Sequence, residues 1–518
     1  MLAADYNRPF SQFPTARMPS CSLHPLPYRT DPGGYFQRIR QAPGAVLLDA
    51  GRPSAKRGRY DLMSAWPLAE LAPAHDESAN AFLQRLRGAL HSLGNAEAPS
   101  AMELPFVGGL IGYLSYDFGR RLEVLPAHSV DDLALQDARF GLYAWALISD
   151  HQLGTSQLLF HPALPQAERQ RLLALFEAPS REDQASFRLS QPFQADIDED
   201  HYRQSIERIQ QYILAGDCYQ VNFAQRFQAP CEGDPWAAYL ALRQACPTPF
   251  SGFQNLGDGN AILSLSPERF LKVSEGQVET RPIKGTRRRG VDAVDDLAQA
   301  EELLASRKDR AENLMIVDLL RNDLGRSCRI GSVKVPELFA LESYPNVHHL
   351  VSCVTAELAP GKDALDLIAG SFPGGSITGA PKIRAMQIID ELEPSRRGLY
   401  CGSLLYLDVR GEMDSSIAIR SLLGPVQGHH TAHGQRQQAE RPGYMIDLLT
   451  DAPANLRDSA GRILAEQCAG ARQINGVEPA CRKGRTKLCR EIAPVALLPG
   501  EASQKDPVHV IGYPCTSA

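Results

Sequence analysis

The sequence predicts an α+β fold, and three features of its patterning carry that prediction. Stretches typical of β-strands recur along the chain, from 45–49 to 412–423. Between them lie segments with apolar residues at helical spacing, such as 79–93 and 198–215. No internal repeat and no long low-complexity tract interrupts this mixture. Over 518 residues, the pattern is typical of one large fused fold or of a few units.

The composition narrows the functional class. Hydrophobic residues make up 43% of the chain and charged residues 22%, as in ordinary globular proteins. The formal net charge of −6 argues weakly against a nucleic-acid binder. The longest apolar runs, such as 142–149, are far shorter than the ~20 residues of a membrane helix, and no signal peptide is recognisable. The 11 scattered cysteines form no C-x-x-C pair, so we expect reduced thiols in a cytoplasmic protein.

The chain divides into regions of different amino-acid composition. Residues 1–34, rich in Pro, Ser and Arg, predict an extended lead-in, and Met18 is a second possible start. An N-terminal region over 35–185 follows, and a polar, Pro-containing stretch at 178–198 marks a boundary. In the N-terminal region we expect a helix at 79–93 and the following strands: 45–49, 59–63, 106–116, 139–148 and 158–160.

The region 195–423 should begin with a helix over 198–215 that ends at Gly216, a residue typical of helix C-caps. One long helix is expected over about 296–324, and two alternating strands over 398–409 and 412–423 predict a hairpin. Further strands are expected at 219–227, 261–266 and 270–273.

Two motifs of this region carry reactive side chains. Pro267 restricts the backbone before Glu268, and a carboxyl group held in this way could act as a general acid, although pairing with a surface cation is the simpler interpretation. Lys284 lies between Pro282 and Gly285, which allow a tight bend and close backbone approach. A lysine near other cations loses its proton more easily and becomes a nucleophile, although a basic anion-binding turn fits as well.

Other side chains suggest ligand binding. Asp309 and Glu312 share one helix face, where two oxygen donors would suit Mg²⁺, although most such runs are solvated. Alternation should point the neighbouring histidines at 348 and 349 to opposite faces of a strand. A glycine-rich loop over 372–384 opens a helix and should attract anions. Arg420 lies in an apolar strand and therefore needs a buried anionic partner or faces a ligand.

Taken together, six motifs resemble the chorismate-utilising family, which includes anthranilate synthase large subunits, isochorismate and salicylate synthases, and aminodeoxychorismate synthase component I. The resemblance covers about residues 44–423. The motifs are Ser266-Pro-Glu-Arg-Phe270, Pro282-Ile-Lys-Gly-Thr286, Asp309-Arg-Ala-Glu-Asn-Leu-Met-Ile-Val-Asp318, Val347-His-His-Leu350, Phe372-Pro-Gly-Gly-Ser-Ile-Thr-Gly-Ala-Pro-Lys382 and Tyr400-Cys-Gly-Ser403.

Within the family, the segment around Lys284 is closest to that of aminodeoxychorismate synthase component I, because anthranilate synthases have alanine at this position. Enzymes that use water carry a lysine base seven residues before the conserved glutamate, where this chain has Ala261. The resemblance therefore implies amination of chorismate at C4, giving 4-amino-4-deoxychorismate for p-aminobenzoate and folate synthesis. Anthranilate synthesis is the alternative.

The resemblance also implies a fold and roles for residues. We expect two β-sheets packed as a sandwich with outer helices, as in anthranilate synthase component I, with a cleft between the sheets. Lys284 would be the nucleophile, Glu268 the general acid, and Glu312 a ligand of Mg²⁺. The substrate-binding residues would be His349, Ser376, Tyr406 and Arg420. Since the chain lacks a Gly-x-Cys-x-Gly glutaminase motif, ammonia should come from a partner glutaminase subunit.

The sequence departs from the family at two places. The family's Leu-Leu-x-Ser motif for tryptophan reads Leu47-Leu-Asp-Ala50 here, which argues against bound tryptophan. Residues 424–518 replace the segment that carries the family's second metal-binding glutamate, and their texture is that of a shifted reading frame. We expect this tail to be largely disordered and the enzyme to be impaired, so that a non-catalytic partner of a glutaminase is a further alternative.

Overall fold

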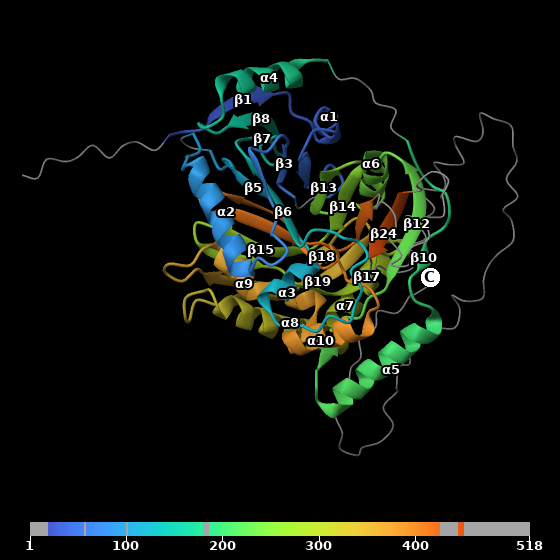
Figure 1. Ribbon diagram of the computed structural model, residues 1–518. Helices are drawn as coiled ribbons and strands as arrows, with labels where there is room; N and C mark the ends of the chain where they lie inside the picture. The colour runs from blue at the N-terminus through green and yellow to red at the C-terminus, as the bar shows by residue number, and fades with distance from the viewer. Residues whose placement is uncertain (1–18, 56–57, 100–101, 180–185, 425–443, 450–518) are drawn as a thin grey trace, which may run out of the picture.

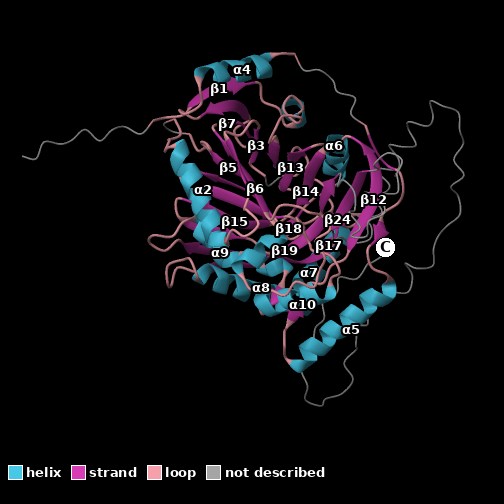
Figure 2. Ribbon diagram, in the orientation of Figure 1, coloured by secondary structure: helices cyan, strands magenta, loops and turns pink. Residues whose placement is uncertain are grey.

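Two large antiparallel β-sheets form the centre of the molecule in a computed structural model, which describes residues 19–55, 58–99, 102–179, 186–424 and 444–449 (Figure 1). Helices lie around the sheets rather than between them (Figure 2). The predicted α+β class, with two sheets packed as a sandwich and helices outside, is confirmed. In the described chain, one sheet has 12 strands and the other has 10.

The 12-stranded sheet consists of β1 (Ser22–Leu26), β2 (Val46–Asp49), β3 (Tyr60–Ser64), β7 (Trp145–Asp150), β8 (Thr155–Phe160), β9 (Phe187–Leu189), β10 (Gln194–Ala195), β12 (Arg226–Gly233), β13 (Phe250–Gly257), β14 (Asn260–Ser266), β23 (Ser421–Gly424) and β24 (Tyr444–Leu449). Its order is β1-β8-β7-β3-β2-β13-β14-β23-β24-β12-β10, and β9 also pairs with β12.

The 10-stranded sheet consists of β4 (Ala69–Leu71), β5 (Gly109–Leu114), β6 (Ala138–Tyr143), β15 (Arg269–Ser274), β16 (Gln277–Thr280), β17 (Ile283–Arg288), β18 (Lys334–Ser343), β19 (Val347–Glu357), β21 (Ser403–Asp408) and β22 (Met413–Ile417). Its order is β17-β19-β16-β15-β22-β21-β5-β6-β4, with β18 on β19. A separate two-stranded sheet pairs β11 (Gln220–Val221) with β20 (Gly379–Ala380).

The helices are α1 (Gly33–Phe36), α2 (Ala79–Leu93), α3 (Gly119–Leu122), α4 (Gln166–Glu177), α5 (Glu199–Ala215), α6 (Pro235–Ala245), α7 (Ala293–Ala305), α8 (Arg307–Gly325), α9 (Ala364–Ser371) and α10 (Lys382–Leu392), with 3₁₀ turns η1 (Tyr116–Phe118) and η2 (Gly375–Ile377). The bounds of α2 agree with the prediction. For α5, Asp198 caps the first turn and Gly216, at φ +82°, ends the helix as expected.

The prediction of one helix over 296–324 is wrong, because Ser306 separates α7 from α8. The backbone of Ser306 is extended, with φ −63° and ψ 109°, and its hydroxyl accepts a hydrogen bond from the Asp309 amide at 3.3 Å. A serine that caps a helix start leaves the preceding helix unable to continue. The break lets α7 and α8 pack separately against β17 and β19.

Both sheets combine strands from either side of the predicted boundary at 178–198. In the 12-stranded sheet β2 pairs with β13, and in the 10-stranded sheet β5 pairs with β21. β1 lies within the predicted lead-in and pairs with β8. The regions before and after the boundary therefore share both sheets.

The predicted hairpin is present, but its second strand divides between the sheets. β21 and β22 pair in the 10-stranded sheet, whereas β23 pairs with β14 in the other sheet. The chain crosses at residues 418–420, where Arg420 adopts a left-handed φ of +52°. Of the predicted disordered tail, β24 lies between β12 and β23, and residues 425–443 and 450–518 lie outside the described residues.

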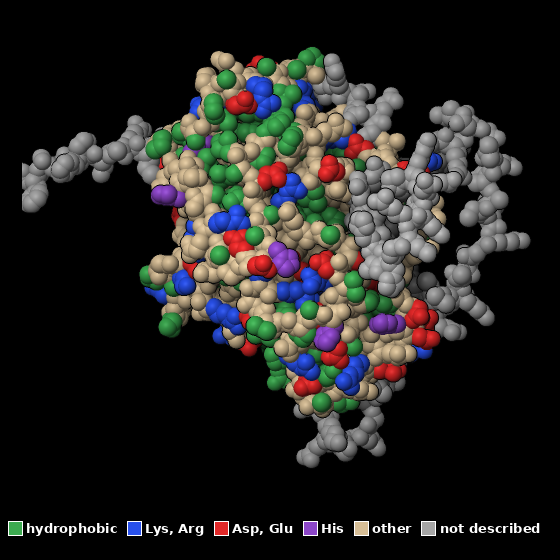
Figure 3. Space-filling model, in the orientation of Figure 1, with side chains coloured by type: hydrophobic (Ala, Val, Ile, Leu, Met, Phe, Trp, Pro, Cys, Tyr) green, Lys and Arg blue, Asp and Glu red, His purple; other side chains and the backbone are tan. Residues whose placement is uncertain are grey.

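The apolar core fills the space between these layers and beneath the outer helices. Phe36, Trp236 and Phe253 pack together under α1 and α6, with ring centroids 5.0 to 5.7 Å apart. On the face seen in Figure 3, lysine and arginine side chains are interspersed with acidic ones and do not gather into one patch. That face lacks the basic stripe typical of nucleic-acid binding.

Candidate active site

Five of the predicted site residues are buried on the side of the 10-stranded sheet that faces α8 and η2. This group, the buried polar cluster, consists of Glu268, Lys284, Glu312, His349 and Ser376. Each is between 2% and 7% exposed. Charged groups in such a position require partners, because burial removes their water. The partners within the cluster therefore define its chemistry.

Lys284 and Glu312 form an ion pair. Lys284 projects from β17, Glu312 projects from α8, and the ammonium nitrogen lies 3.4 Å from the carboxylate Oε1. Gly285, at φ +90°, permits this close approach, because a Cβ at that position would lie 2.9 Å from Cβ of Asp309 on the helix. The close backbone approach expected from the sequence is therefore confirmed. The lysine is held facing a buried carboxylate and away from water.

Glu268 precedes β15 and accepts a hydrogen bond at 2.7 Å from the hydroxyl of Ser376, which lies on η2. Both side chains are buried, although the motifs that carry them are about 100 residues apart in sequence. Glu268 is thus not a surface carboxylate paired with its neighbour. The pair places a carboxyl group with a fixed direction beside the glycine-rich loop.

The two contact pairs are joined through the two-stranded sheet. Gln220 on β11 donates from Nε2 to Glu312 Oε1 at 3.3 Å, and its backbone pairs with that of Ala380. Asn222 donates from its side chain to the Ile377 carbonyl at 3.1 Å. The short strand β11 and the residue after it therefore connect the loop that carries Ser376 with the carboxylate that meets Lys284.

His349 lies on β19 and is neutral at ordinary pH. Burial, together with the positive charge of Arg420, lowers the pKa of His349 to about 3. Its Nδ1 lies 2.9 Å from the hydroxyl of Thr286 on β17. The preceding His348 instead contacts Asp296 and Ser343, so the two histidines have separate partners, as alternation along a strand predicts.

Arg420 has no carboxylate partner among the residues that the structure describes. Its Nη1 lies 3.7 Å from the sulfur of Cys246, and its charge acts on His349. A half-buried guanidinium without a carboxylate partner can receive an anion in a two-pronged contact. The ligand-facing role of Arg420 stays a prediction.

The expected magnesium ligands are only partly available. Asp309 forms an ion pair with Arg287 at 2.9 Å, which leaves Glu312 as the carboxylate that faces Lys284. In the described ranges, no group of three or more Asp, Glu, His or Cys side chains could hold a metal. Magnesium commonly binds through one or two carboxylates, with water and substrate completing its shell. Glu312 fits that chemistry when a substrate carboxylate is present.

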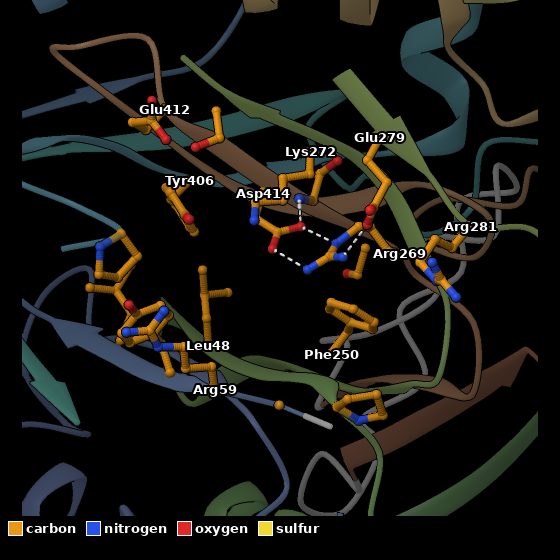
Figure 4. A pocket seen from close by; sticks show the side chains of 18 of the residues that line it. Leu48, Arg59, Phe250, Arg269, Lys272, Glu279, Arg281, Tyr406, Glu412 and Asp414 are labelled. Atoms are coloured by element: carbon orange, nitrogen blue, oxygen red, sulfur yellow. Dashed lines mark hydrogen bonds and ion pairs between the residues drawn. The ribbon is translucent and has the colours of Figure 1, made fainter. Parts of the chain in front are cut away.

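Tyr406 is the exception among the predicted residues. It lies on β21 and lines a cavity of about 940 Å³ between the two sheets, which Figure 4 shows from close by. Of the predicted site residues, Tyr406 alone lines this cavity. The structure does not bring Tyr406 together with the other predicted substrate-binding residues, because its position on the strand directs the ring toward Phe106, with centroids 6.0 Å apart; its role stays a prediction.

The cavity, referred to below as the intersheet cavity, is lined by both sheets. Leu48 and Phe250 come from the 12-stranded sheet, and Arg269 and Asp414 come from the 10-stranded sheet (Figure 4). Arg269 makes two hydrogen bonds of 2.9 Å to Asp414 and one of 2.6 Å to Glu279. The predicted cleft between the sheets exists, but the buried polar cluster lies outside it. The expectation concerning tryptophan stays a prediction.

Sequence reasoning missed several polar residues of the site. Thr286 lies within the lysine motif, and its position two residues from Lys284 could have indicated it. Asn313 follows Glu312 and contacts the Ser352 hydroxyl at 2.5 Å, which anchors α8 to β19. Gln220 lies on a strand of two residues, and no local pattern points to it. Only the tertiary contact with Glu312 reveals its place.

Two general expectations can be compared with the described chain. None of its helices combines the length and apolar character needed to cross a bilayer. Its seven cysteines are all buried free thiols, so the structure shows no disulfide among them.

Comparison with known proteins identifies the family. The model for chorismate binding enzymes matches residues 46–433. Aminodeoxychorismate synthase component 1 of Salmonella typhimurium is 47% identical over 410 residues, which cover 77% of this chain and 88% of that protein. Anthranilate synthase component 1 of Mycolicibacterium smegmatis is 39% identical over 397 residues, which cover 73% of this chain and 75% of that protein.

A solved structure gives the same result for the fold. Anthranilate synthase component I from Streptococcus pneumoniae aligns with a TM-score of 0.64 at 27% identity and covers 81% of this chain and 92% of that chain. The resemblance inferred from the six motifs is confirmed, and this chain belongs to the family of chorismate binding enzymes.

Proposed function

We propose that this chain aminates chorismate at C4, with Mg²⁺ and with ammonia from a partner glutaminase, in the cytoplasm. The product is 4-amino-4-deoxychorismate, for p-aminobenzoate and folate synthesis. The observation that carries the proposal is the amine of Lys284, which is 4% exposed and lies 3.4 Å from Glu312. Relatives named aminodeoxychorismate synthase component 1, at 46% to 47% identity, support it, and the designation component 1 implies a second subunit.

The reaction has two covalent steps. In the first, the ammonium of Lys284 gives one proton to solvent as the substrate binds, the resulting amine bonds to C2 of the ring, the ring double bonds shift, and the C4–O bond breaks. Glu268 gives its proton to the departing hydroxyl, which leaves as water. In the second, ammonia bonds to C4, the double bonds shift back, and the C2–N bond breaks to return the amine to Lys284. The new amino group gives its surplus proton to Glu268, so the enzyme is restored.

The neighbouring residues bind and orient the substrate. The guanidinium of Arg420 meets a substrate carboxylate, and the hydroxyl of Ser376 holds Glu268 in position. Neutral His349 adds no positive charge beside Arg420. Glu312 is the described residue that would hold Mg²⁺, which would supply positive charge for the ring carboxylate and draw Glu312 away from the lysine ammonium. Burial of the cluster excludes water from the covalent intermediate.

Incubation of the full chain with chorismate, Mg²⁺ and ammonium tests the proposal. We expect chorismate to disappear without anthranilate fluorescence, and p-aminobenzoate to form only after a lyase is added. Fluorescent product would instead identify an anthranilate synthase, the alternative supported by the relative at 39% identity. Stimulation of a glutaminase without chorismate consumption would identify a non-catalytic partner, as the altered segment 424–518 suggested.

The Lys284→Ala variant tests the nucleophile. We expect turnover to fall by about 10³-fold or more, because a covalent step is lost. Mass spectrometry of the unaltered chain, quenched during turnover, should find a substrate adduct on Lys284. Lys272→Ala, which changes a lysine of the intersheet cavity, is the matched control and should retain its rate. Equal amination by Lys284→Ala and no adduct would refute the mechanism.

A further inference from the structure

The segment 372–381 carries Ser376 and is closed at its base by a single side chain. Lys382, the first residue of α10, donates from Nζ to the carbonyl of Ser371 at 2.7 Å. Ser371 is the last residue of α9, so the bond joins the two ends of the segment. The ten residues between them therefore form a loop with a fixed base.

The same ammonium fastens the base of the loop to α8. Lys382 Nζ lies 2.6 Å from Oδ2 of Asp323, and the two side chains are 12% and 4% exposed. Burial lowers the pKa of Lys382 and raises the pKa of Asp323, because each charged form loses water, and each charge therefore depends on the other. Glu312 belongs to the same helix, so this ion pair connects the loop to the helix that carries the carboxylate beside Lys284.

The tip of the loop lies close against two other elements, α8 and β22. A Cβ at Gly375 would lie 2.7 Å from Cδ2 of Leu319 on α8, and a Cβ at Gly374 would lie 2.7 Å from Cδ1 of Ile417 on β22. At this tip, Ser376 donates its hydrogen bond to Glu268. A shift of the base relative to α8 would therefore move the hydroxyl away from the carboxyl group.

We propose that Lys382 is a positioning residue for the reaction, and that with Asp323 it fixes the loop 372–381 so that Ser376 orients Glu268. This inference rests on the proposed function. Lys382 touches neither substrate nor the reacting atoms and acts through Ser376. Because the hydrogen bond from Ser376 favours the charged carboxylate, its loss favours the protonated acid and moves the alkaline limb of the pH–rate profile to higher pH.

The test compares K382M with K382R and with K362M, which removes a lysine whose side chain is 45% exposed and which pairs with Asp366. We expect K382M to lower kcat for chorismate about tenfold or more, to change KM less than threefold, and to move the alkaline limb. K382R should restore most of kcat, and K362M should behave as the unaltered chain. Since K382M leaves Asp323 buried without its partner, K382M/D323N serves as the variant without either charge.

Equal kcat and pH profiles for K382M and K362M would overturn the proposal, as would a loss of kcat with an unmoved limb or without rescue by arginine. If the unaltered chain does not aminate chorismate, the proposed function fails, and hydrogen exchange then tests the positioning alone. Faster exchange of amides 374–378 in K382M/D323N but not in K362M supports the fixed loop. Unchanged exchange in both refutes it.

Discussion

The two faces of the 10-stranded sheet differ in how the fold uses charge. Ile283 lines the intersheet cavity, whereas the next residue, Lys284, belongs to the buried polar cluster. In the cavity, Arg269 is fully paired with Asp414 and Glu279 by short hydrogen bonds. On the cluster side, the pair of Lys284 and Glu312 is longer at 3.4 Å, and Arg420 meets no carboxylate in the described chain. The paired charges of the cavity stabilise the sheet, whereas the charges of the cluster lie at the proposed reaction site.

The largest expected difference in kcat is between two variants, each of which replaces one carboxylate on one face of the sheet by an amide. Glu268→Gln retains an oxygen that accepts from Ser376 but carries no acidic proton, so kcat should fall by about 10² to 10⁴. Glu279→Gln, in the intersheet cavity, should leave kcat nearly unchanged. Steady-state chorismate consumption at saturating ammonium measures both. Equal losses in the two variants would remove the distinction between the faces.

An intermediate effect is expected in the stability of the cluster toward acid. The pKa of His349 is lowered to about 3 in the folded state, against about 6.5 for an unfolded histidine. The resulting stability is present above about pH 6.5 and is lost as the pH falls toward 3. At pH 5 the loss is about 2 kcal/mol.

His349→Gln should remove this pH dependence. Thermal unfolding measured between pH 7 and 4.5 should show a shallower decline in Tm for the variant than for the unaltered chain. His75→Gln is the control, because the His75 side chain is 97% exposed. A decline as steep in His349→Gln as in the unaltered chain would show that other groups govern acid unfolding.

The smallest expected effect concerns Tyr406. Because its ring lines the intersheet cavity, Tyr406→Phe should change kcat and KM for chorismate by less than about twofold. Ser376→Ala, by comparison, removes a buried hydrogen bond worth about 1.5 to 3 kcal/mol when the acceptor is charged, which corresponds to a tenfold or greater loss. A tenfold rise in KM for Tyr406→Phe would show that the Tyr406 hydroxyl contacts the substrate.

The sequence predicted those features that depend on local pattern. Glu268, Lys284 and His349 each lie in a motif whose neighbours fix the backbone, and the structure buries all three, whereas their roles stay predictions. Tyr406 could not be placed in the same way, because β21 is buried on both faces and alternation does not distinguish them. The break at Ser306 was not predicted, because apolar residues continue at helical spacing on both sides of it.

The features that the sequence could not predict depend on long-range contacts. Gln220 reaches Glu312 across 92 residues, and Lys382 reaches Asp323 across 59. Neither contact leaves a periodic trace in the sequence, since each rests on how strands and helices pack. The division of 412–423 between two sheets was hidden for a related reason, because no glycine or proline marks the crossing at residues 418–420.

The crossing of the chain at residues 418–420 links the position of Arg420 to the spacing between the two sheets. β22 and β23 belong to different sheets, and only this short connection separates them. The position of the Arg420 guanidinium therefore depends on the distance between the two sheets. The amine of Lys284, in contrast, is fixed to β17. In the mechanism proposed above, a molecule that forced the layers apart would move the carboxylate-binding arginine away from the nucleophilic lysine, so the thickness of the sandwich would set their alignment.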